Sequence, residues 1–455
     1  MTAMNRILRF RHLLAPDGML HDQQLVVGAD GRIERLEPAS PDNRDWDGWL
    51  ALPGMPNAHS HVFQRALAGY GEARKSDEDS FWSWREAMYR LAGQIAPDDL
   101  HVIARQGFID MLRAGFTSVA EFHYLHHLPD GTRTRAMADA VIAAAGETGI
   151  RLRLLPVAYF HAGFGGKAPT AGQVRFAHRN LDEYLELLQS LLPQQPGIAP
   201  HSLRAVPVDW LNDLVNGAES LLGNDFPIHI HIAEQRREID DCVQAHSRTP
   251  IRLLADSVNL NPRWQLVHAT HADAEEIDRV AESGAGVVIC PITEAYLGDG
   301  LFDAVHFCEQ GGDLSIGSDS NCRIDVFEEL RLLEYGQRLR AERRARLSDE
   351  KGLGESLYAR CASTGGNALR MSVGAIAPGA FADLVVVDES ADALAGHDAS
   401  TALDALVING SRADVADVYV GGKRVIENGS HASAHVARDS FHCVTKRLLK
   451  SNGQG

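Results

Sequence analysis

The sequence of 455 residues predicts an α/β protein, a (β/α)8 TIM-like barrel with a small β-sandwich domain built from both termini. Between about residues 98 and 330, short apolar or β-branched runs alternate with amphipathic stretches, which is the pattern of repeated βα units. The two ends of the chain lack this alternation and show short strands split by turns. We therefore assign residues 54–373 to the barrel, and residues 1–53 together with 374–455 to the composite β domain.

Two hairpins are predicted in the terminal segments. Residues 26–33 have the pattern of a strand, an Asp-Gly turn and a second strand. Residues 418–425 form the second hairpin, with its turn at Gly421 and Gly422. Because no internal repeat, low-complexity tract or Gly/Ser linker separates the terminal segments from the barrel, we expect the two parts to pack rigidly together.

The barrel strands are predicted from six apolar runs, with helices between them at residues 136–145 and 182–191. The runs are residues 117–122, 151–158, 226–231, 264–268, 286–290 and 313–319. Several of them carry a histidine, glutamate or aspartate at the carboxyl end. Those ends form the catalytic face of a (β/α)8 barrel, so we expect polar residues distant in sequence to meet there.

The composition excludes several classes of partner. The formal net charge is −17, whereas binding to nucleic acid or to an anionic membrane requires clustered positive charge. Arginines interrupt the first 14 residues, and no run of about 18 apolar residues occurs, so we expect a cytoplasmic protein.

The six cysteines are scattered without a C-x-x-C pair, and we interpret them as reduced, mostly structural thiols.

Two H-x-H motifs follow apolar runs. His59 and His61 would lie on the same side of a strand, which suits a shared metal ion. With 21 histidines, chance alone gives about one such motif, so a single occurrence is weak evidence. The second motif, His229 and His231, is followed three residues later by Glu234 and makes a metal site more credible.

Two later runs end in residues of the same kind. His268 ends one run and Asp319 ends another. Taken singly, His268 has the character of a core histidine and Asp319 that of a helix cap or turn residue. Together with the two H-x-H motifs they form an ordered series of imidazoles and carboxylates at successive strand ends, which favours a catalytic metal site.

This series resembles the amidohydrolase superfamily. The matching residues are His59-x-His61, His231-x-x-Glu234, His268 and Ser318-Asp319. Four further segments, residues 79–90, 120–124, 201–204 and 293–300, resemble the formimidoylglutamate deiminase family of bacterial histidine breakdown. The resemblance implies hydrolysis of the C–N bond of a linear amidine, which converts N-formimino-L-glutamate and water to N-formyl-L-glutamate and ammonia.

The resemblance also implies the metal site. Superfamily members with two metal ions bridge them with a carboxylated lysine at the fourth strand, whereas residues 76–350 contain only Lys167. A mononuclear site therefore follows, with His59, His61, His231 and Asp319 as its ligands. Three imidazoles and one carboxylate suit one Zn²⁺ per subunit, and Fe²⁺ also fits.

Catalytic roles follow from the same resemblance. Asp319 would accept the proton of the attacking water, and His268 would stabilise or orient the nucleophile. Glu234 would handle protons at the substrate nitrogen until ammonia leaves.

The substrate carries two carboxylates, which arginine binds with two parallel hydrogen bonds. Arg85 and Arg204 are the candidates for these contacts. Gln64, Tyr124 and His201 are expected to support them in the substrate pocket.

Alternatives remain open at the level of sequence. The chain could be another mononuclear amidohydrolase deaminase, acting on a guanidine-like or heterocyclic substrate, or a non-catalytic scaffold of the same descent. Thr293 and Glu294 replace the Ser-Asn pair of many nucleobase deaminases, which counts against a purine pocket, and Tyr296 stands where the deiminase pattern has asparagine. A homodimer is compatible with the sequence.

A dense group of histidines lies outside the series. His123, His126 and His127 fall in a predicted loop and do not alternate as strand residues do. We therefore expect them to have hydrogen-bonding or surface roles and not to bind a metal.

Overall fold

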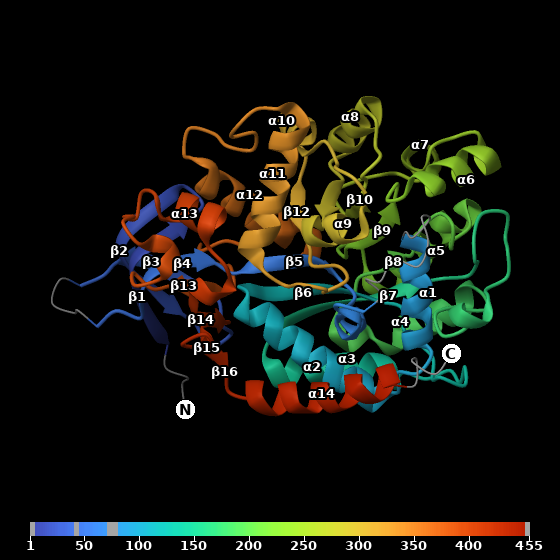
Figure 1. Ribbon diagram of the computed structural model, residues 1–455, viewed down its shortest axis with the longest axis horizontal. Coiled ribbons are helices and arrows are strands. Elements are labelled where there is room, and N and C mark those ends of the chain that lie inside the picture. Colours follow the sequence, from blue (N-terminus) through green and yellow to red (C-terminus); the bar gives the residue numbers. More distant parts are fainter. Residues whose placement is uncertain (1–4, 41–44, 71–80, 451–455) are drawn as a thin grey trace.

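A barrel of parallel strands forms the centre of the computed structural model, which describes residues 5–40, 45–70 and 81–450 (Figure 1). Within these residues the barrel strands are β5 (Met55–Ser60), β6 (Phe116–His123), β7 (Arg151–Ala158), β8 (Ala199–Pro200), β9 (Ile228–Ile232), β10 (Trp264–His268), β11 (Gly286–Ile289) and β12 (Leu314–Ile316). They pair as two four-stranded sheets, β5-β6-β7-β8 and β9-β10-β11-β12. Single parallel bridges, Ile198 to Ile228 and Ser60 to Asp319, join the two sheets into a ring.

β9 illustrates how the apolar runs become barrel strands. All five of its residues are buried, because both faces of a barrel strand are covered. Its side chains alternate, so the isoleucines lie on one side while His229 and His231 lie on the other. His231 is the histidine nearer the carboxyl end of the strand. His229 lies deeper, where its Nε2 is 2.9 Å from the carbonyl oxygen of Ala368.

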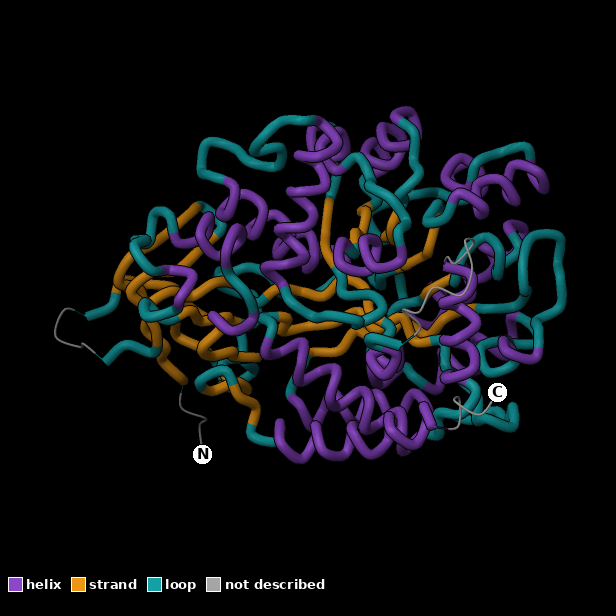
Figure 2. Tube along the Cα trace, viewed as in Figure 1, coloured by secondary structure: helices purple, strands orange, loops and turns teal. Residues whose placement is uncertain are grey.

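Helices between the strands cover the outside of the barrel (Figure 2). They are α2 (Pro97–Arg113), α3 (Ala136–Thr148), α4 (Leu181–Ser190), α5 (Leu211–Leu222), α6 (Arg236–His246), α7 (Pro250–Ser257), α8 (Ala274–Ser283), α10 (Ala304–Glu309), α11 (Val326–Ala341) and α12 (Leu353–Leu369). The stretches predicted at residues 136–145 and 182–191 correspond to α3 and α4. α8 begins with a reciprocal pair of hydrogen bonds between Asp273 and Glu276, and it ends at Gly284 with φ of +74°.

Shorter segments lie in the connections at the barrel ends. After β5 the chain forms η1 (Val62–Leu67) and then α1 (Phe81–Ala92), and after β11 it forms α9 (Pro291–Leu297). Further 3-10 turns are η2 (Ala171–Gln173), η3 (Leu192–Gln194), η4 (Val208–Trp210), η5 (Asp392–Leu394) and η6 (Arg412–Asp414). η1, α1 and α9 all contribute residues to the cavity described below.

Strands from both termini form a second sheet beside the barrel. They are β1 (Arg6–Ala15), β2 (Gly18–Val27), β3 (Ile33–Pro38), β4 (Gly48–Pro53), β13 (Leu384–Val387), β14 (Val415–Val420), β15 (Lys423–Glu427) and β16 (Ser430–His431). Their order is β16-β15-β14-β13-β4-β1-β2-β3, and the predicted hairpins are β2–β3 and β14–β15. Phe10, Leu25 and Leu384 belong to the separate apolar core of this sheet. The α/β fold class, with its barrel and a separate sheet from both termini, is confirmed; the terminal strands pair in one continuous eight-stranded sheet, where two packed sheets of a sandwich were expected.

A partly buried ion pair links the barrel to the terminal sheet. The Nε and Nη2 atoms of Arg151 on β7 donate to the two carboxylate oxygens of Asp383, at 3.0 and 2.9 Å. The backbone N–H of Gly421 donates to the same carboxylate at 2.7 Å. Bidentate pairing fixes the relative orientation of its partners, so this contact holds the hairpin turn against the barrel.

Two helices near the C-terminus were not foreseen from the sequence, namely α13 (Ala402–Asn409) and α14 (Ala434–Lys450). α14 leaves the terminal sheet and lies along α2 of the barrel (Figure 1), where Arg447 pairs with Asp99. Among the described residues, no helix combines the length and the apolar character that crossing a membrane requires.

Candidate metal centre and active site

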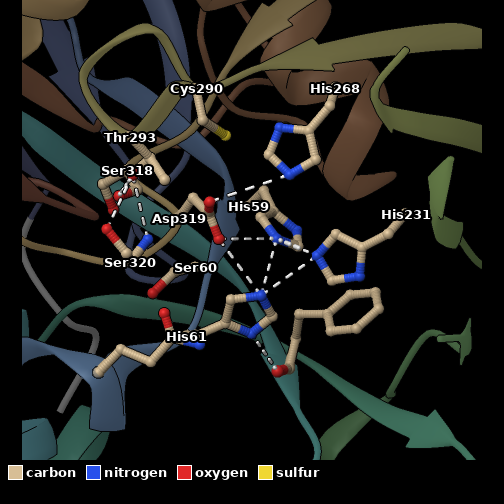
Figure 3. A network of polar contacts seen from close by, with 12 residues as sticks. His59, Ser60, His61, His231, His268, Cys290, Thr293, Ser318, Asp319 and Ser320 are labelled. Carbon is tan, nitrogen blue, oxygen red and sulfur yellow. Dashed lines mark hydrogen bonds and ion pairs between the residues drawn. The ribbon is translucent and has the colours of Figure 1, made fainter. Parts of the chain in front are cut away.

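Four side chains converge at the carboxyl ends of three barrel strands (Figure 3). The Nε2 atoms of His59 and His61 are 3.1 Å apart, and the Nε2 atom of His231 lies 3.1 Å from the first and 3.3 Å from the second. Oδ1 of Asp319 lies 3.4 Å from His59 Nε2 and 3.3 Å from His61 Nε2. All four residues are buried.

These separations fit a tetrahedral metal ion. With bonds of about 2.0 to 2.1 Å, the ligand atoms around a tetrahedral zinc ion lie about 3.3 to 3.4 Å apart. Burial lowers the pKa of His59 to about 3, so this imidazole is neutral at neutral pH and can act as a ligand. Although burial opposes it, contacts with the three histidines His59, His61 and His268 lower the pKa of Asp319, which therefore remains a carboxylate.

Backbone contacts between β5 and the end of β12 position Asp319. The N–H groups of Ser318 and Asp319 donate to the carbonyl oxygen of His59 at 3.0 and 2.9 Å, and the N–H of His61 donates to the carbonyl oxygen of Asp319 at 2.9 Å. Asp319 has φ of +42°, a left-handed conformation that non-glycine residues rarely adopt. At Gly317 a Cβ atom would lie 2.7 Å from the carbonyl oxygen of His59, so a glycine is needed for this close approach.

A buried network of polar side chains also connects β5 with the end of β12. Nδ2 of Asn57 donates to the Ser318 hydroxyl at 2.6 Å, and Oδ1 of Asn57 accepts from the Ser318 N–H at 3.0 Å. Asn321 adds a contact from its Nδ2 to the Ser60 hydroxyl at 3.1 Å. Sequence reasoning missed Asn57 and Asn321, because asparagines in strands and turns have many ordinary structural roles.

Carbonyl oxygens orient two of the clustered histidines. Nδ1 of His61 lies 3.0 Å from the carbonyl oxygen of Phe122, and Nδ1 of His231 lies 3.2 Å from that of His201. Metal-binding histidines usually donate the second ring N–H in this way, which directs Nε2 to the ion. These contacts place residues from β6 and β8 directly behind the cluster.

His268 and Glu234 lie beside the cluster. His268 Nε2 is 3.9 Å from Oε1 of Glu234 and 3.9 Å from Oδ2 of Asp319, while its Nδ1 is 3.1 Å from Oε1 of Glu294. Although burial acts to lower it, the carboxylates of Glu234, Glu294 and Asp319 raise the pKa of His268 to about 10. Burial raises the pKa of Glu234 to about 7. Sequence reasoning missed the contact between Glu294 and His268. The only signal at this position was that Thr293 and Glu294 replace the Ser-Asn pair of many nucleobase deaminases.

One cavity joins this group to the expected substrate residues. Its lining includes the metal-cluster residues His61, His231 and Asp319, and beside them Glu234 and His268. The five predicted substrate residues line it as well, namely Gln64, Arg85, Tyr124, His201 and Arg204.

The contacts of two of these residues show how the pocket wall is held. Nε2 of Gln64 donates to the Tyr124 hydroxyl at 2.8 Å. Nε of Arg204 lies 3.7 Å from Oε1 of the buried Glu238 on α6. The same cavity is thus lined by two arginines and by members of the histidine and aspartate cluster.

Further cavity residues were not predicted. Trp84, Met88, Tyr89, Tyr159 and Phe176 also line the cavity. Tyr159 directly follows β7, so the rule that strand ends carry functional residues could have identified it. Tyr296 lies on α9 outside the lining, and its neighbour Leu297 is the lining residue there.

The separate histidine group packs in the interior. His123, His126 and His127 are buried, so the surface role considered for them is wrong. The predicted loop is also wrong for His123, which is the last residue of β6. The hydrogen-bonding role is present: Nε2 of His126 is 2.9 Å from the carbonyl oxygen of Val157, and Nε2 of His127 is 3.0 Å from that of Ala177. The ring of His178 lies 4.8 Å from that of His126 and completes the group.

Comparisons with known proteins identify the family of the chain. The amidohydrolase family matches residues 50–425 of the chain. The sequence is 43% identical to formimidoylglutamate deiminase of Pseudomonas aeruginosa, over 98% of this chain and 100% of that protein. It is 30% identical to a 5-methylthioadenosine/S-adenosylhomocysteine deaminase of Halobacterium salinarum, over 83% of this chain and 82% of that protein. The crystal structure of an amidohydrolase from Brucella melitensis, 38% identical, matches with a TM-score of 0.90 over 98% of this chain and 100% of that one.

Proposed function

The chain belongs to the amidohydrolase family, and from this membership we propose that it hydrolyses N-formimino-L-glutamate to N-formyl-L-glutamate and ammonia, as a step of histidine degradation. The observation that carries this proposal is a single cavity lined by Arg85 and Arg204 and by members of the histidine and aspartate cluster. The 43% identity to a formimidoylglutamate deiminase along nearly the whole chain supports the same substrate.

One Zn²⁺ ion per subunit is the metal that we infer for the cluster. His59, His61, His231 and Asp319 would hold it, since three neutral imidazoles and a carboxylate at tetrahedral spacing suit zinc. When bound, zinc lowers the pKa of water from 15.7 to about 7 and so supplies a nucleophile at neutral pH. Fe²⁺ is the alternative that the same donors allow.

The side chains around the cluster move the protons. Asp319 accepts a proton from water, and His268, held through Nδ1 by Glu294, orients the water with Nε2. Glu234 transfers protons to the terminal amidine nitrogen, because a carboxyl group with a pKa near 7 can both give and take a proton at neutral pH. A C–O bond forms at the amidine carbon, its bond to that nitrogen breaks, and both protons of the water leave with ammonia.

The two arginines that line the cavity select the substrate. A guanidinium group matches a carboxylate with two parallel hydrogen bonds, and the substrate has two carboxylates for Arg85 and Arg204. We assign Gln64, Tyr124 and His201 to the walls that orient the glutamate part. The hydrogen bond between Gln64 and Tyr124 fixes the position of the Tyr124 hydroxyl, which reduces the entropy lost on binding.

Ammonia release from a panel of substrates tests the proposal. The zinc-loaded protein should release ammonia from N-formimino-L-glutamate with a kcat/KM at least about tenfold above that for guanidines, purine nucleosides or amidines without carboxylates. The 30% identity to a nucleoside deaminase favours one alternative, deamination of a heterocycle. Activity on a purine together with silence on N-formimino-L-glutamate would establish that alternative.

A further inference from the structure

A second group of metal-binding side chains adjoins the first. His268, Cys290 and Asp319 are buried, and each offers one ligand atom within 4.8 Å of the others. Figure 3 shows the Cys290 sulfur directed toward the space beside the His268 ring and the Asp319 carboxylate. Asp319 belongs to both groups. In the described part of the chain, these are the two places where such atoms converge.

Glu294 orients two members of this group at once. Its Oε1 lies 3.1 Å from Nδ1 of His268 and accepts from the backbone N–H of Cys290 at 2.9 Å. A carboxylate on the second ring nitrogen is the usual support of a metal-binding histidine. The contact turns Nε2 of His268 away from Glu294 and toward Asp319, where Oδ2 is 3.9 Å away. The site therefore has an oriented ligand as well as a thiol.

The local charge favours a cation at this position. The carboxylates of Glu234 and Glu294 lie 3.9 and 3.1 Å from the two nitrogens of the His268 ring, and Asp319 lies on the same side as Glu234. Asp299 is also close enough to interact electrostatically with Glu234 and Glu294. Buried carboxylates that repel one another are stabilised by a nearby positive ion.

We propose that His268, Cys290 and Asp319 form a second, weaker site for a thiophilic divalent cation such as Zn²⁺ or Cd²⁺, and that an ion bound there inhibits the enzyme. A thiolate selects soft metals over Mg²⁺ or Ca²⁺. The site is weaker because it has three protein ligands and shares one of them with the first site. Inhibition rests on the proposed function, since the ion occupies His268, which orients the water in that mechanism, and Asp319, which accepts the proton of the water.

The test starts from protein that carries one zinc ion per subunit. Cd²⁺ is added, and the ultraviolet charge-transfer band of a cadmium thiolate is recorded together with metal content after dialysis. The wild type should develop the band up to one additional equivalent. The Cys290→Ser protein should keep its first metal ion and show no band. Cys361→Ser, a change at an equally buried thiol, and Cys443→Ser, at an exposed one, should both retain the band.

The activity assay uses Zn²⁺ above one equivalent. Saturation of the second site should lower kcat by about 10² or more, the scale of a general acid–base group. Cys290→Ser should raise the zinc concentration that gives half inhibition at least about tenfold, because even the loss of an outer-shell partner has an effect of this size.

Several outcomes would overturn the proposal: no thiolate band in the wild type, loss of the band in Cys443→Ser, or inhibition of Cys290→Ser at the wild-type zinc concentration. Because the absence of a band in the wild type would by itself refute the thiolate contact, a poorly folded variant does not remove the test. If N-formimino-L-glutamate is not hydrolysed by the one-zinc protein, the proposed function fails, whereas the band and the metal content still decide the second site.

Discussion

At the scale of single residues, burial and charge set the protonation of the candidate site. Burial lowers the pKa of His59 to about 3 and raises the pKa of Glu234 to about 7. The first shift keeps an imidazole available to a metal ion, whereas the second brings a carboxyl group close to neutral pH. The two effects follow one rule, because burial disfavours the charged form of either group.

Glu234→Gln tests the proposed proton transfer. The amide has nearly the same shape but cannot exchange a proton, so kcat should fall by about 10² or more. Metal content should stay at the wild-type value, since Glu234 is not among the four clustered ligands. The measurement is kcat with metal analysis of the same sample, and the exposed Glu275→Gln serves as control. Near-normal turnover would refute the role of Glu234.

Arg204→Met tests recognition of a substrate carboxylate. Loss of charge-assisted hydrogen bonds of about 1.5 to 3 kcal/mol should raise KM by about 10- to 100-fold, while zinc content is unchanged. Steady-state kinetics measure the effect, with the surface change Arg252→Met as the matched control. An unchanged KM would remove Arg204 from the substrate pocket.

At the scale of elements, the connection from β9 to α6 links the proposed proton-transfer residue to a proposed substrate-binding residue. Ala233 has φ of +53°, and the next residue, Glu234, donates its backbone N–H to Oε2 of Glu238 at 3.2 Å. The other carboxylate oxygen of Glu238 lies 3.7 Å from Nε of Arg204. A single buried carboxylate in the first turn of α6, that of Glu238, therefore contacts both the backbone of Glu234 and the side chain of Arg204.

Glu238→Gln should show this coupling. The charge that orients the guanidinium is lost, so KM should rise by about tenfold, and kcat should change less because the amide oxygen still accepts from Glu234. A double-mutant cycle with Arg204→Met provides the decisive measurement. In the Arg204→Met background, Glu238→Gln should have little further effect on KM. Additive effects of the two changes would contradict the coupling.

The sequence was most informative where one strand supplies the signal. Period-2 alternation and the barrel rule suffice to identify His59, His61 and His231 at strand ends. Glu294 and Glu238 could not be identified in this way, because each acts from the first turn of a helix and contacts a residue of another βα unit. α14 was missed for a related reason, because it packs against α2, which lies more than 300 positions earlier in the chain.

At the scale of the whole molecule, the buried histidine group couples stability to pH. Burial lowers the pKa of His123 to about 4, that of His178 to about 3, and that of His126 well below 6.5. Between about pH 6.5 and 4 the unfolded chain therefore binds protons that the folded chain does not. The free energy of unfolding should decrease as the pH falls through this range, by up to about 1.4 kcal/mol per pH unit for each histidine.

His178→Phe tests this linkage. The variant lacks one of the titrating groups, so its melting temperature should fall less steeply than that of the wild type between pH 6.5 and 4. The exposed His435→Gln should keep the wild-type slope. Thermal melts at constant zinc concentration measure the difference. Equal slopes for His178→Phe and the wild type would refute the linkage.

Charge is distributed unevenly over the molecule. The chain carries −17, yet a second cavity that shares Arg85 and Arg204 with the candidate active site is also lined by Lys167 and Arg237, against which stands the carboxylate of Asp241. We call Arg85, Lys167, Arg204 and Arg237 the basic patch. Their positive charge would attract an acidic substrate from solution, and salt weakens this attraction, because the Debye screening length is about 10 Å at 0.1 M ionic strength.

The value of kcat/KM should therefore decrease as the ionic strength increases. Lys167→Gln should weaken this salt dependence, while Lys351→Gln, remote from both cavities, should not. Stopped-flow or steady-state assays at several salt concentrations measure the slope. A slope that Lys167→Gln leaves unchanged would exclude a role for this patch.

The bridge between Ser60 and Asp319 has a consequence for biosynthesis. The four clustered side chains come from the first, fifth and eighth strands of the barrel, and His59 precedes Asp319 by 260 positions. A ribosome must synthesise most of the barrel before these groups can meet, and contacts of such high sequence separation form late in folding. A metal ion that requires all four groups could therefore bind only after translation of the eighth strand, and it would stabilise the closed ring and not its precursors.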